Sequence, residues 1–151
     1  MVALLFTLLF VATVANGAQF TFKNQCNYGI VPTVTGPGYG PNKICDLSSR
    51  NGACTVSYDG QLTFRNGYNG RKALEIGTTK AEFKTNANGI DYYDLSVVDG
   101  FDVSMQLINQ CNGDTITCPY DQCPEAYDYS TDDSKVHAGS ACGSYTIIFC
   151  P

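Results

Sequence analysis

Three of the carboxylates within residues 81–107 stand at places where a strand would ordinarily carry neutral polar side chains. Glu82 stands between two apolar residues, Asp94 stands between a tyrosine and a leucine, and Asp99 lies in the turn Val98-Asp99-Gly100. Such alternation is typical of a sheet with one buried face and one wet face. Neighbouring carboxylates can hold different protonation states, which is what general acid–base chemistry needs.

A hairpin is predicted to bring two of these acids together. Residues 87–89 read Ala-Asn-Gly, and a three-residue loop favours glycine at its last position. The resulting register pairs Asn86 with Ile90, Phe83 with Tyr93 and Glu82 with Asp94. Opposed like charges destabilise a strand pair. Two interpretations remain open: solvated acids that splay apart, or a functional carboxylate pair on an open sheet face.

The rest of the chain consists of short strand-like segments and turns. Asp59-Gly60 predicts a hairpin between residues 55–58 and 61–65, and residues 72–76 form another short strand. Alternating apolar residues predict a strand over residues 101–107, while residues 124–129 could form one helical turn. Many short strands with frequent Asn-Gly turns indicate an all-β fold, an antiparallel sandwich or barrel.

The amino terminus resembles an export signal. Residues 1–17 carry no charged side chain and end in small residues, so we expect a signal peptide cleaved before Ala18 and one domain over residues 18–151. No other stretch is long enough to span a membrane. The net charge of −5 and pI near 4.6 argue against nucleic-acid binding. A secreted, extracellular monomer is expected.

The chain has eight cysteines, all after residue 17. In an exported chain this predicts disulfides rather than a metal site or other cofactor, although eight cysteines allow about 105 pairings. The one histidine, His137, has no accompanying ligand pattern and is expected to be solvated. No phosphate loop, dinucleotide motif or nucleophile elbow occurs.

Four segments resemble thaumatin-like proteins, the family-five pathogenesis-related proteins of plants. Residues 78–101 resemble the family's central segment, from TTKAEF to DGF. The sequences CPEAYDY at 123–129, followed by Asp132-Asp133, and SYTIIFCP at 144–151 resemble the family's later segments. Residues 18–26, AQFTFKNQC, are similar to its mature amino terminus. The resemblance runs through the mature chain except for about residues 32–77, and it implies a thaumatin-like antiparallel β-sandwich with little helix.

The resemblance also implies disulfide connectivity. Cys26 would pair with Cys150, Cys111 with Cys142 and Cys118 with Cys123, which leaves Cys45 and Cys54 to each other. Full-length members carry a disulfide-rich second domain between the cysteines that match Cys118 and Cys123. Here only four residues separate these cysteines. The sequence therefore resembles a small form that keeps the sandwich and lacks one wall of the cleft.

The family's acidic cleft is associated with one arginine and four acids. By motif, the acids carry over to Glu82, Asp94, Asp99 and Asp132. The arginine has no secure counterpart, and Arg65 and Arg71 are the candidates, with Arg65 the better guess. The resemblance implies a defence-type, antifungal protein that binds β-1,3-glucan or a related cell-wall polysaccharide.

Two other functions stay open. The first is weak endo-β-1,3-glucanase activity, with Glu82 as the acid, Asp94 as the base, and Asp99 raising the pKa of the acid by repulsion. The second is inhibition of a foreign secreted glycanase. We favour binding over hydrolysis, because an open sheet face holds substrate and excludes water poorly.

Overall fold

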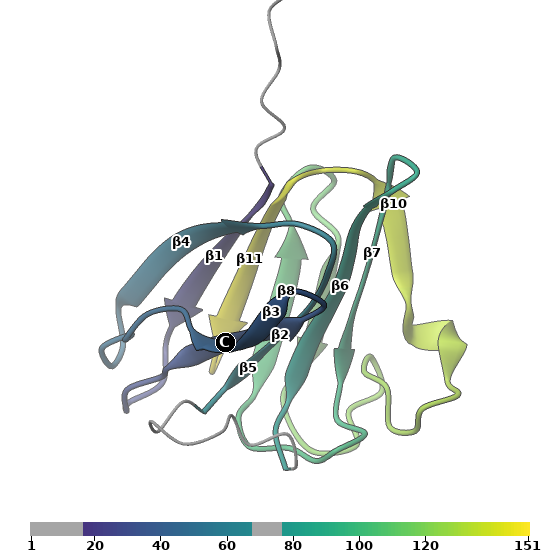
Figure 1. Cartoon of the computed structure of the whole chain (residues 1–151). Coiled ribbons are helices and arrows are strands. Elements are labelled where there is room, and N and C mark those ends of the chain that lie inside the picture. The colour runs from purple at the N-terminus through teal and green to yellow at the C-terminus, as the bar shows by residue number, and fades with distance from the viewer. Residues whose placement is uncertain (1–16, 68–76) are drawn as a thin grey trace, which may run out of the picture.

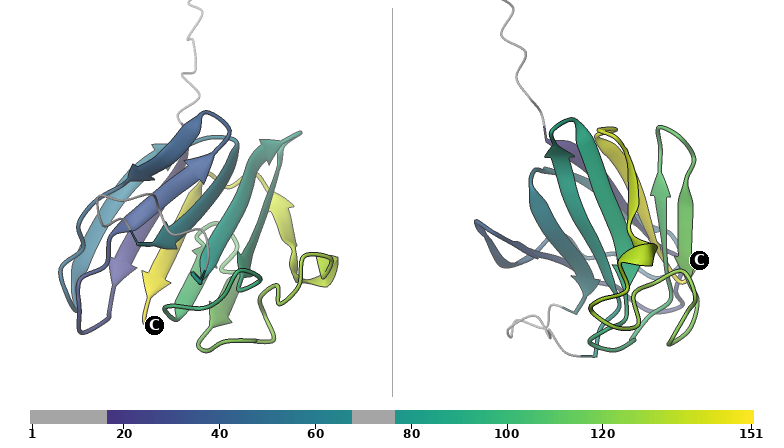
Figure 2. Two further views of the ribbon diagram at one scale, coloured as in Figure 1. Left: turned by 60° about the horizontal axis from the view of Figure 1, so that its bottom comes forward. Right: turned by 90° about the vertical axis from the view of Figure 1, so that its right-hand side faces the viewer.

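The computed structural model describes residues 17–67 and 77–151. They form two β-sheets packed face to face, with the core between them (Figures 1 and 2). Within the described residues the helical content is one 3₁₀ turn, Asp133–Lys135. The predicted all-β sandwich is confirmed. The expected signal segment and the strand at residues 72–76 lie outside the described residues.

The five-stranded sheet has the order β4-β1-β11-β8-β9. First and last strands lie side by side: β1 pairs with β11 in parallel, and the other pairs in this sheet are antiparallel. The strands are β1 (Ala18–Asn24), β4 (Gly52–Tyr58), β8 (Met105–Asn109), β9 (Thr115–Cys118) and β11 (Ser144–Phe149).

The six-stranded sheet is antiparallel throughout, with the order β10-β7-β6-β5-β2-β3. Its strands are β2 (Pro32–Gly36), β3 (Tyr39–Lys43), β5 (Gln61–Asn66), β6 (Lys80–Ala87), β7 (Ile90–Ser96) and β10 (His137–Ser140). The adjacent strands β6 and β7 carry Glu82 and Asp94.

Aromatic rings fill the centre of the sandwich. Phe20 of β1 lies with its ring centroid 4.7 Å from that of Phe64 and 4.9 Å from that of Phe83. Phe83 in turn lies 5.0 Å from Tyr145 of β11. All four side chains are almost completely buried. Since alternate residues of a strand face opposite sides, burying Phe83 and Tyr93 turns Glu82 and Asp94 outward.

The predicted hairpin at Asp59-Gly60 is wrong. The flanking strands β4 and β5 belong to different sheets, so these two residues connect the layers. Gly60 has a φ of 89°, which suits a tight turn whether that turn joins two strands of one sheet or connects the two sheets. Local turn chemistry therefore identified a reversal of the chain but not the partner of each strand.

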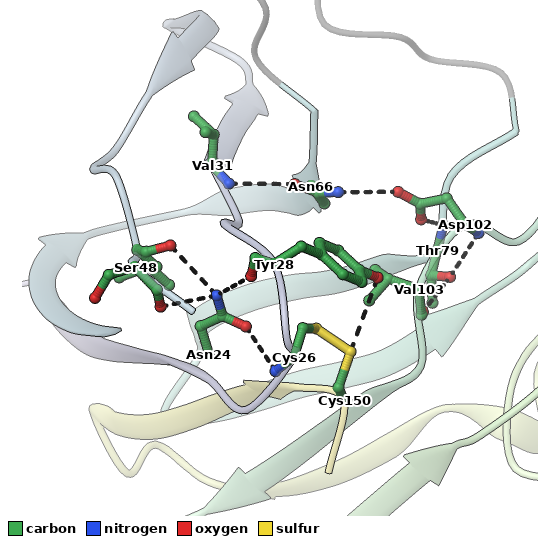
Figure 3. The surroundings of a disulfide bond; sticks show 11 residues. Asn24, Cys26, Tyr28, Val31, Ser48, Asn66, Thr79, Asp102, Val103 and Cys150 are labelled. Atoms are coloured by element: carbon green, nitrogen blue, oxygen red, sulfur yellow. Dashed lines mark hydrogen bonds between the residues drawn. A yellow bond between two sulfur atoms is a disulfide. The ribbon is translucent and has the colours of Figure 1, made fainter. Parts of the chain in front are cut away.

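The predicted strand over residues 101–107 begins only at Met105. Asp102 is engaged elsewhere: its Oδ1 accepts a hydrogen bond from the Thr79 backbone N–H at 2.9 Å, and its Oδ2 accepts one from Asn66 Nδ2 at 3.3 Å (Figure 3). These bonds bend the chain at residues 101–104. The helical turn predicted at 124–129 is also absent, and that segment forms turns around an isolated bridge at Tyr127.

Four disulfides bind the loops and strand ends, in the same pairs that the resemblance implies: Cys26–Cys150, Cys45–Cys54, Cys111–Cys142 and Cys118–Cys123. The first joins the end of β1 to the end of the chain (Figure 3). Beside it, the Asn24 side chain accepts from the Cys26 N–H and donates to the carbonyls of Tyr28 and Ser48. This network fixes the loop that follows β1.

Candidate functional site: an acidic groove on the six-stranded sheet

The hairpin of β6 and β7 places Glu82 directly opposite Asp94 on the outer face of the sheet, in the predicted register. One detail differs. Ala87, not Asn86, faces Ile90, because the turn has two residues, Asn88-Gly89, and a bulge in β6 between Lys84 and Ala87 precedes it. Asn86 lies within this bulge, with a positive φ of 50°. The bulge compensates for the shorter turn, so the acids still pair.

Asp94 is the acid whose environment changes its chemistry most. Burial first, and then the adjacent Glu82 carboxylate, raise the pKa of Asp94 to about 8. Its Oδ1 is buried and has no hydrogen-bond partner among the described residues. At neutral pH Asp94 therefore holds a proton in most molecules. This arrangement favours Asp94 as the proton donor of the pair, the reverse of the roles expected from sequence.

Asp99 lies in the turn after β7, where its carboxylate forms an ion pair with Lys80 of β6. That cation offsets its charge. The influences that raise the pKa of Asp94 are burial and Glu82, and Asp99 is not one of them. Asp99 thus borders the site as half of an ion pair with Lys80.

Asp132 is held at the start of the 3₁₀ turn. Ser134 Oγ donates to its Oδ1 at 2.6 Å, and Lys135 Nζ lies 3.9 Å from its Oδ2. The next residue, Asp133, lines the hollow beside Glu82 and Asp94, whereas Asp132 does not line it. The turn that matches the family motif thus contributes Asp133, and not Asp132, to the lining of this hollow.

Tyr127 joins these acids, and sequence reasoning did not single it out. It forms a parallel bridge with Ser96 at the end of β7, through Val97 N–H to Tyr127 O and Tyr127 N–H to Leu95 O. Burial first, and then the charges of Asp94, Asp133, Asp132 and Glu82, raise the pKa of the Tyr127 phenol. One phenol therefore lies within electrostatic reach of four carboxyl groups. Its place in the matched CPEAYDY segment was the available signal.

A hollow of about 420 Å³ surrounds the pair. We call it the acid hollow, and its lining residues are Lys80, Glu82, Asp94, Ser96, Val98, Asp99, Tyr127, Ser130 and Asp133. The segment from Tyr127 to Val136 projects at the side of β7 and carries the 3₁₀ turn (Figures 1 and 2). The face is therefore bordered on one side, in contrast to the fully open face expected from the missing domain.

A second hollow of about 390 Å³ also includes Glu82 and Asp94. We call it the Tyr92 hollow, and its other lining residues are Gln61, Leu62, Thr63, Phe83, Lys84, Tyr92 and Val136. Because the two hollows share the acid pair, they form one groove that follows β6 and β7. We refer to both together as the acidic groove.

Arg65 lies on β5 and is 3% exposed. Its Nη2 donates to Thr35 Oγ1 at 2.6 Å, and it is not among the residues that line the acidic groove. Arg71 lies outside the described residues. Of the two candidates, Arg65 therefore does not line the groove at the acid pair.

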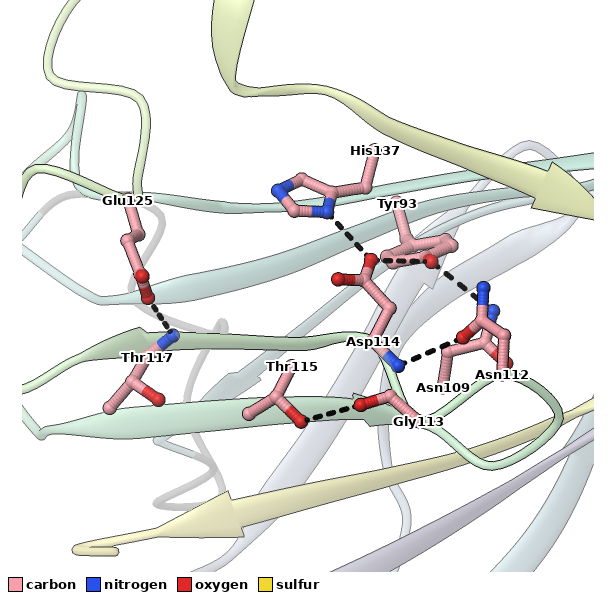
Figure 4. Close-up of polar contacts among 9 residues, drawn as sticks. All are labelled: Tyr93, Asn109, Asn112, Gly113, Asp114, Thr115, Thr117, Glu125 and His137. Carbon is pink, nitrogen blue, oxygen red and sulfur yellow. Dashed lines mark hydrogen bonds and ion pairs between the residues drawn. The ribbon is translucent and has the colours of Figure 1, made fainter.

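A separate polar cluster binds the edge strand β10 to the other sheet (Figure 4). His137 Nδ1 lies 2.6 Å from Asp114 Oδ2, and the Tyr93 hydroxyl donates to the same oxygen at 2.8 Å. Burial would raise the pKa of Asp114, but the bonds from Tyr93 and His137 outweigh it and hold the pKa below its usual value. The expectation of a solvated His137 is therefore wrong. These residues are more than 20 apart in sequence, so no local pattern indicates their contact.

Asp91 is a fully buried acid that the sequence did not indicate. It is 1% exposed and accepts from Asn86 N–H at 2.6 Å, Cys142 N–H at 3.0 Å and Tyr145 Oη at 2.5 Å. Burial favours the neutral acid, yet these donors outweigh it and lower its pKa. Asp91 therefore acts as a structural anion that fastens the β6–β7 hairpin to the start of β11.

The described residues contain no group of three His, Cys, Asp or Glu side chains arranged to hold a metal ion. Within the same residues there is no helix of the length and hydropathy that a membrane span requires.

Comparison with known proteins defines the class. Two solved structures share the fold. The thaumatin-like xylanase inhibitor TLXI has a TM-score of 0.61 at 20% identity, and the match covers 87% of this chain and 99% of that chain. The protein elicitor MoHrip2 from Magnaporthe oryzae has a TM-score of 0.68 at 13% identity, and the match covers 89% of this chain and 100% of that chain. The architecture is thus a thaumatin-like β-sandwich. No protein-family model matches the chain.

Curated relatives show the family directly. A thaumatin-like protein of Oryza sativa subsp. japonica is 32% identical over 91% of this chain and 87% of its own length. Pathogenesis-related protein 1C of Hordeum vulgare is 32% identical over 99% of this chain and 98% of its own length. The chain belongs to the thaumatin-like, PR-5 family, as a small, defence-type member with four disulfides.

Proposed function

We propose that this chain is a secreted, antifungal defence protein that binds β-1,3-glucan, or a related cell-wall polysaccharide, in the acidic groove. The observation that carries the proposal is the Glu82–Asp94 pair, where a buried carboxyl oxygen without a partner lies at the meeting point of two hollows. A buried polar atom without a partner costs free energy. A ligand hydroxyl in the groove would recover that loss if the Asp94 carboxyl group turns toward it.

The pair suits a neutral ligand rich in hydroxyl groups. With a pKa raised to about 8, Asp94 offers both an O–H donor and an acceptor at neutral pH, while a carboxylate accepts only. Sugar hydroxyls do both, so they match this combination. An anionic ligand would be repelled by Asp133 and by the net charge of −5. The family and the four disulfides support action outside the cell.

Weak endo-β-1,3-glucanase activity is the second candidate, and the environment of Asp94 is the observation that favours it. Glycoside hydrolysis needs one carboxylic acid with a raised pKa and one carboxylate. Asp94 would protonate the leaving oxygen, and Glu82 would act as base or nucleophile. The groove is bordered on one side only, so water is excluded poorly and binding stays the primary proposal.

The third candidate is inhibition of a foreign glycanase. The fold neighbour TLXI is by its title a xylanase inhibitor. At 20% identity this likeness concerns the fold, and it suggests a protein partner only as a function that the same scaffold can support.

One experiment separates the three functions. The purified mature protein is mixed with insoluble β-1,3-glucan, and the bound fraction is measured together with the release of reducing ends. The proposal predicts binding without release. Binding with release that Asp94→Asn abolishes would indicate the hydrolase. No binding would contradict the proposal and leave inhibition of glycanases as the function to assay.

Glu82→Gln and Asp94→Asn test where the polysaccharide binds. Both variants keep side chains of the same size on the outer face, so the fold should be retained. Asp121→Asn is the matched control, because Asp121 lies in the Cys118–Cys123 loop, beyond the acidic groove. The two groove variants should lose retention on the glucan, while the control should bind as the wild type does.

A further inference from the structure

The acidic groove continues past the acid pair along β6 and β7. Three cross-strand pairs face outward in succession: Lys80 with Ser96, Glu82 with Asp94, and Lys84 with Tyr92. Outward residues two apart on a strand are about 7 Å apart, so the three rows extend over about 13 Å. The acid hollow takes the first two rows, and the Tyr92 hollow takes the last two.

Tyr92 gives the far end an aromatic surface. Its side chain is 37% exposed on the outer face of β7, whereas its neighbour Tyr93 is buried in the core at 1%. Val136, also 37% exposed, lies on the adjoining segment before β10 and lines the same hollow. An exposed ring and an aliphatic side chain together offer an apolar surface to the C–H face of a sugar ring.

Polar groups border this apolar surface. Lys84 lies opposite Tyr92, and Gln61 and Thr63 of β5 line the other side of the hollow. An ammonium, an amide and a hydroxyl can each bond a sugar hydroxyl. An apolar floor with a few convergent polar groups is the usual composition of a small-molecule site. The Tyr92 hollow therefore has the chemistry of a sugar subsite, independently of the carboxylates.

We infer that the Tyr92 hollow is a second sugar subsite, in which Tyr92 stacks on a glucosyl unit of the polysaccharide chain that binds at Glu82 and Asp94. This inference rests on the proposed function of the acid hollow. Its ligand is the continuation of the same chain, because the two hollows share the acid pair. Chain length, rather than charge, is what this subsite recognises.

The test is the dependence of affinity on ligand length. Tyr92→Ala is titrated by calorimetry with β-1,3-linked glucose disaccharide and hexasaccharide, next to the wild type. The variant should bind the hexasaccharide about tenfold more weakly, the loss expected for a removed aromatic surface. It should bind the disaccharide as the wild type does, because that ligand is held at the acid pair. Tyr92→Phe, which keeps the ring, should retain the affinity for both.

Tyr120→Ala is the matched control, since Tyr120 is 56% exposed in the loop between Cys118 and Cys123 and lies outside both hollows. It should leave both affinities unchanged. A Tyr92→Ala protein that binds the hexasaccharide like the wild type overturns the second subsite alone. A wild type that binds neither ligand overturns the proposed function, and the two failures are thus distinguishable. Equal losses for both ligands in Tyr92→Ala would also contradict a subsite that recognises length.

Discussion

At the scale of single residues, the Glu82–Asp94 pair is the feature that a stability argument does not explain. Two acids directly opposite each other destabilise a strand pair, and here one of them is also buried. The alternation and the turn residues were enough to predict that they face each other. The division of roles could not be predicted, because the burial of Asp94 depends on neighbours from distant segments, such as Tyr127 and Val136.

Asp94→Asn should stabilise the protein increasingly as the pH rises. The pKa of Asp94 is about 8 in the folded state and about 3.9 when unfolded, so ionisation opposes folding. The stability that this raised pKa provides is fully present below about pH 4, and it is lost as the pH rises to about 8. In that window the free energy of unfolding of the wild type should fall relative to the variant by up to about 1.4 kcal/mol per pH unit.

Urea unfolding of both proteins at a series of pH values measures this difference. Asp99→Asn is the control, because Asp99 lies on the same face but is exposed and paired with Lys80. Its difference from the wild type should vary little across the window. A difference between Asp94→Asn and the wild type that is constant with pH would show that Asp94 titrates normally.

At the scale of elements, the sheet edges were the least predictable part of the fold. β10 was not expected, because its four residues, His-Ala-Gly-Ser, lack the β-branched and aromatic residues typical of strands. Its place depends on pairing with β7 and on the bond between His137 and Asp114. The hairpin prediction at Asp59-Gly60 was wrong for a similar reason, because a turn signal does not say whether the next strand stays in the same sheet.

Asp114→Ala should loosen β10 from the β8–β9 turn. It removes the acceptor of both His137 and the Tyr93 hydroxyl, and losing such bonds costs about 1–3 kcal/mol of unfolding free energy. Hydrogen exchange should become faster for the amides of β10, while the amides of β1 and β11 stay protected. Because the pKa of Asp114 is lowered in the fold, the cost should diminish as the pH falls below about 4. An unchanged exchange rate in β10 would contradict this role.

At the scale of the whole molecule, the first and last strands hold the sandwich together by pairing with each other. β1 and β11 lie in parallel at the centre of the five-stranded sheet, and Cys26–Cys150 joins their ends across a separation of 124 residues. Composition and alternation predicted an antiparallel sandwich or barrel, whereas the choice of the sandwich and the disulfide pairing came from the resemblance. The parallel pairing of the terminal strands is a long-range contact that no local pattern indicates.

Removing the Cys26–Cys150 disulfide should destabilise the protein more than removing Cys118–Cys123. The first closes a separation of 124 residues and the second a separation of only 5. Loop entropy makes the difference about 2–3 kcal/mol in unfolding free energy. Paired Cys→Ala variants, compared by urea unfolding under oxidising conditions, measure it. Equal losses would mean that loop closure is not the source of the stabilisation.

The most direct test of the central claim is to map ligand contacts by NMR. The protein, labelled with ¹⁵N, is titrated with a soluble β-1,3-linked glucose hexasaccharide, and the shift of each amide is followed. The largest shifts should fall on β6 and β7 around Glu82, Asp94 and Tyr92, and on Tyr127, with little change in the five-stranded sheet. Shifts confined to the five-stranded sheet, or no shifts at all, would contradict the assignment of the acidic groove as the glucan site.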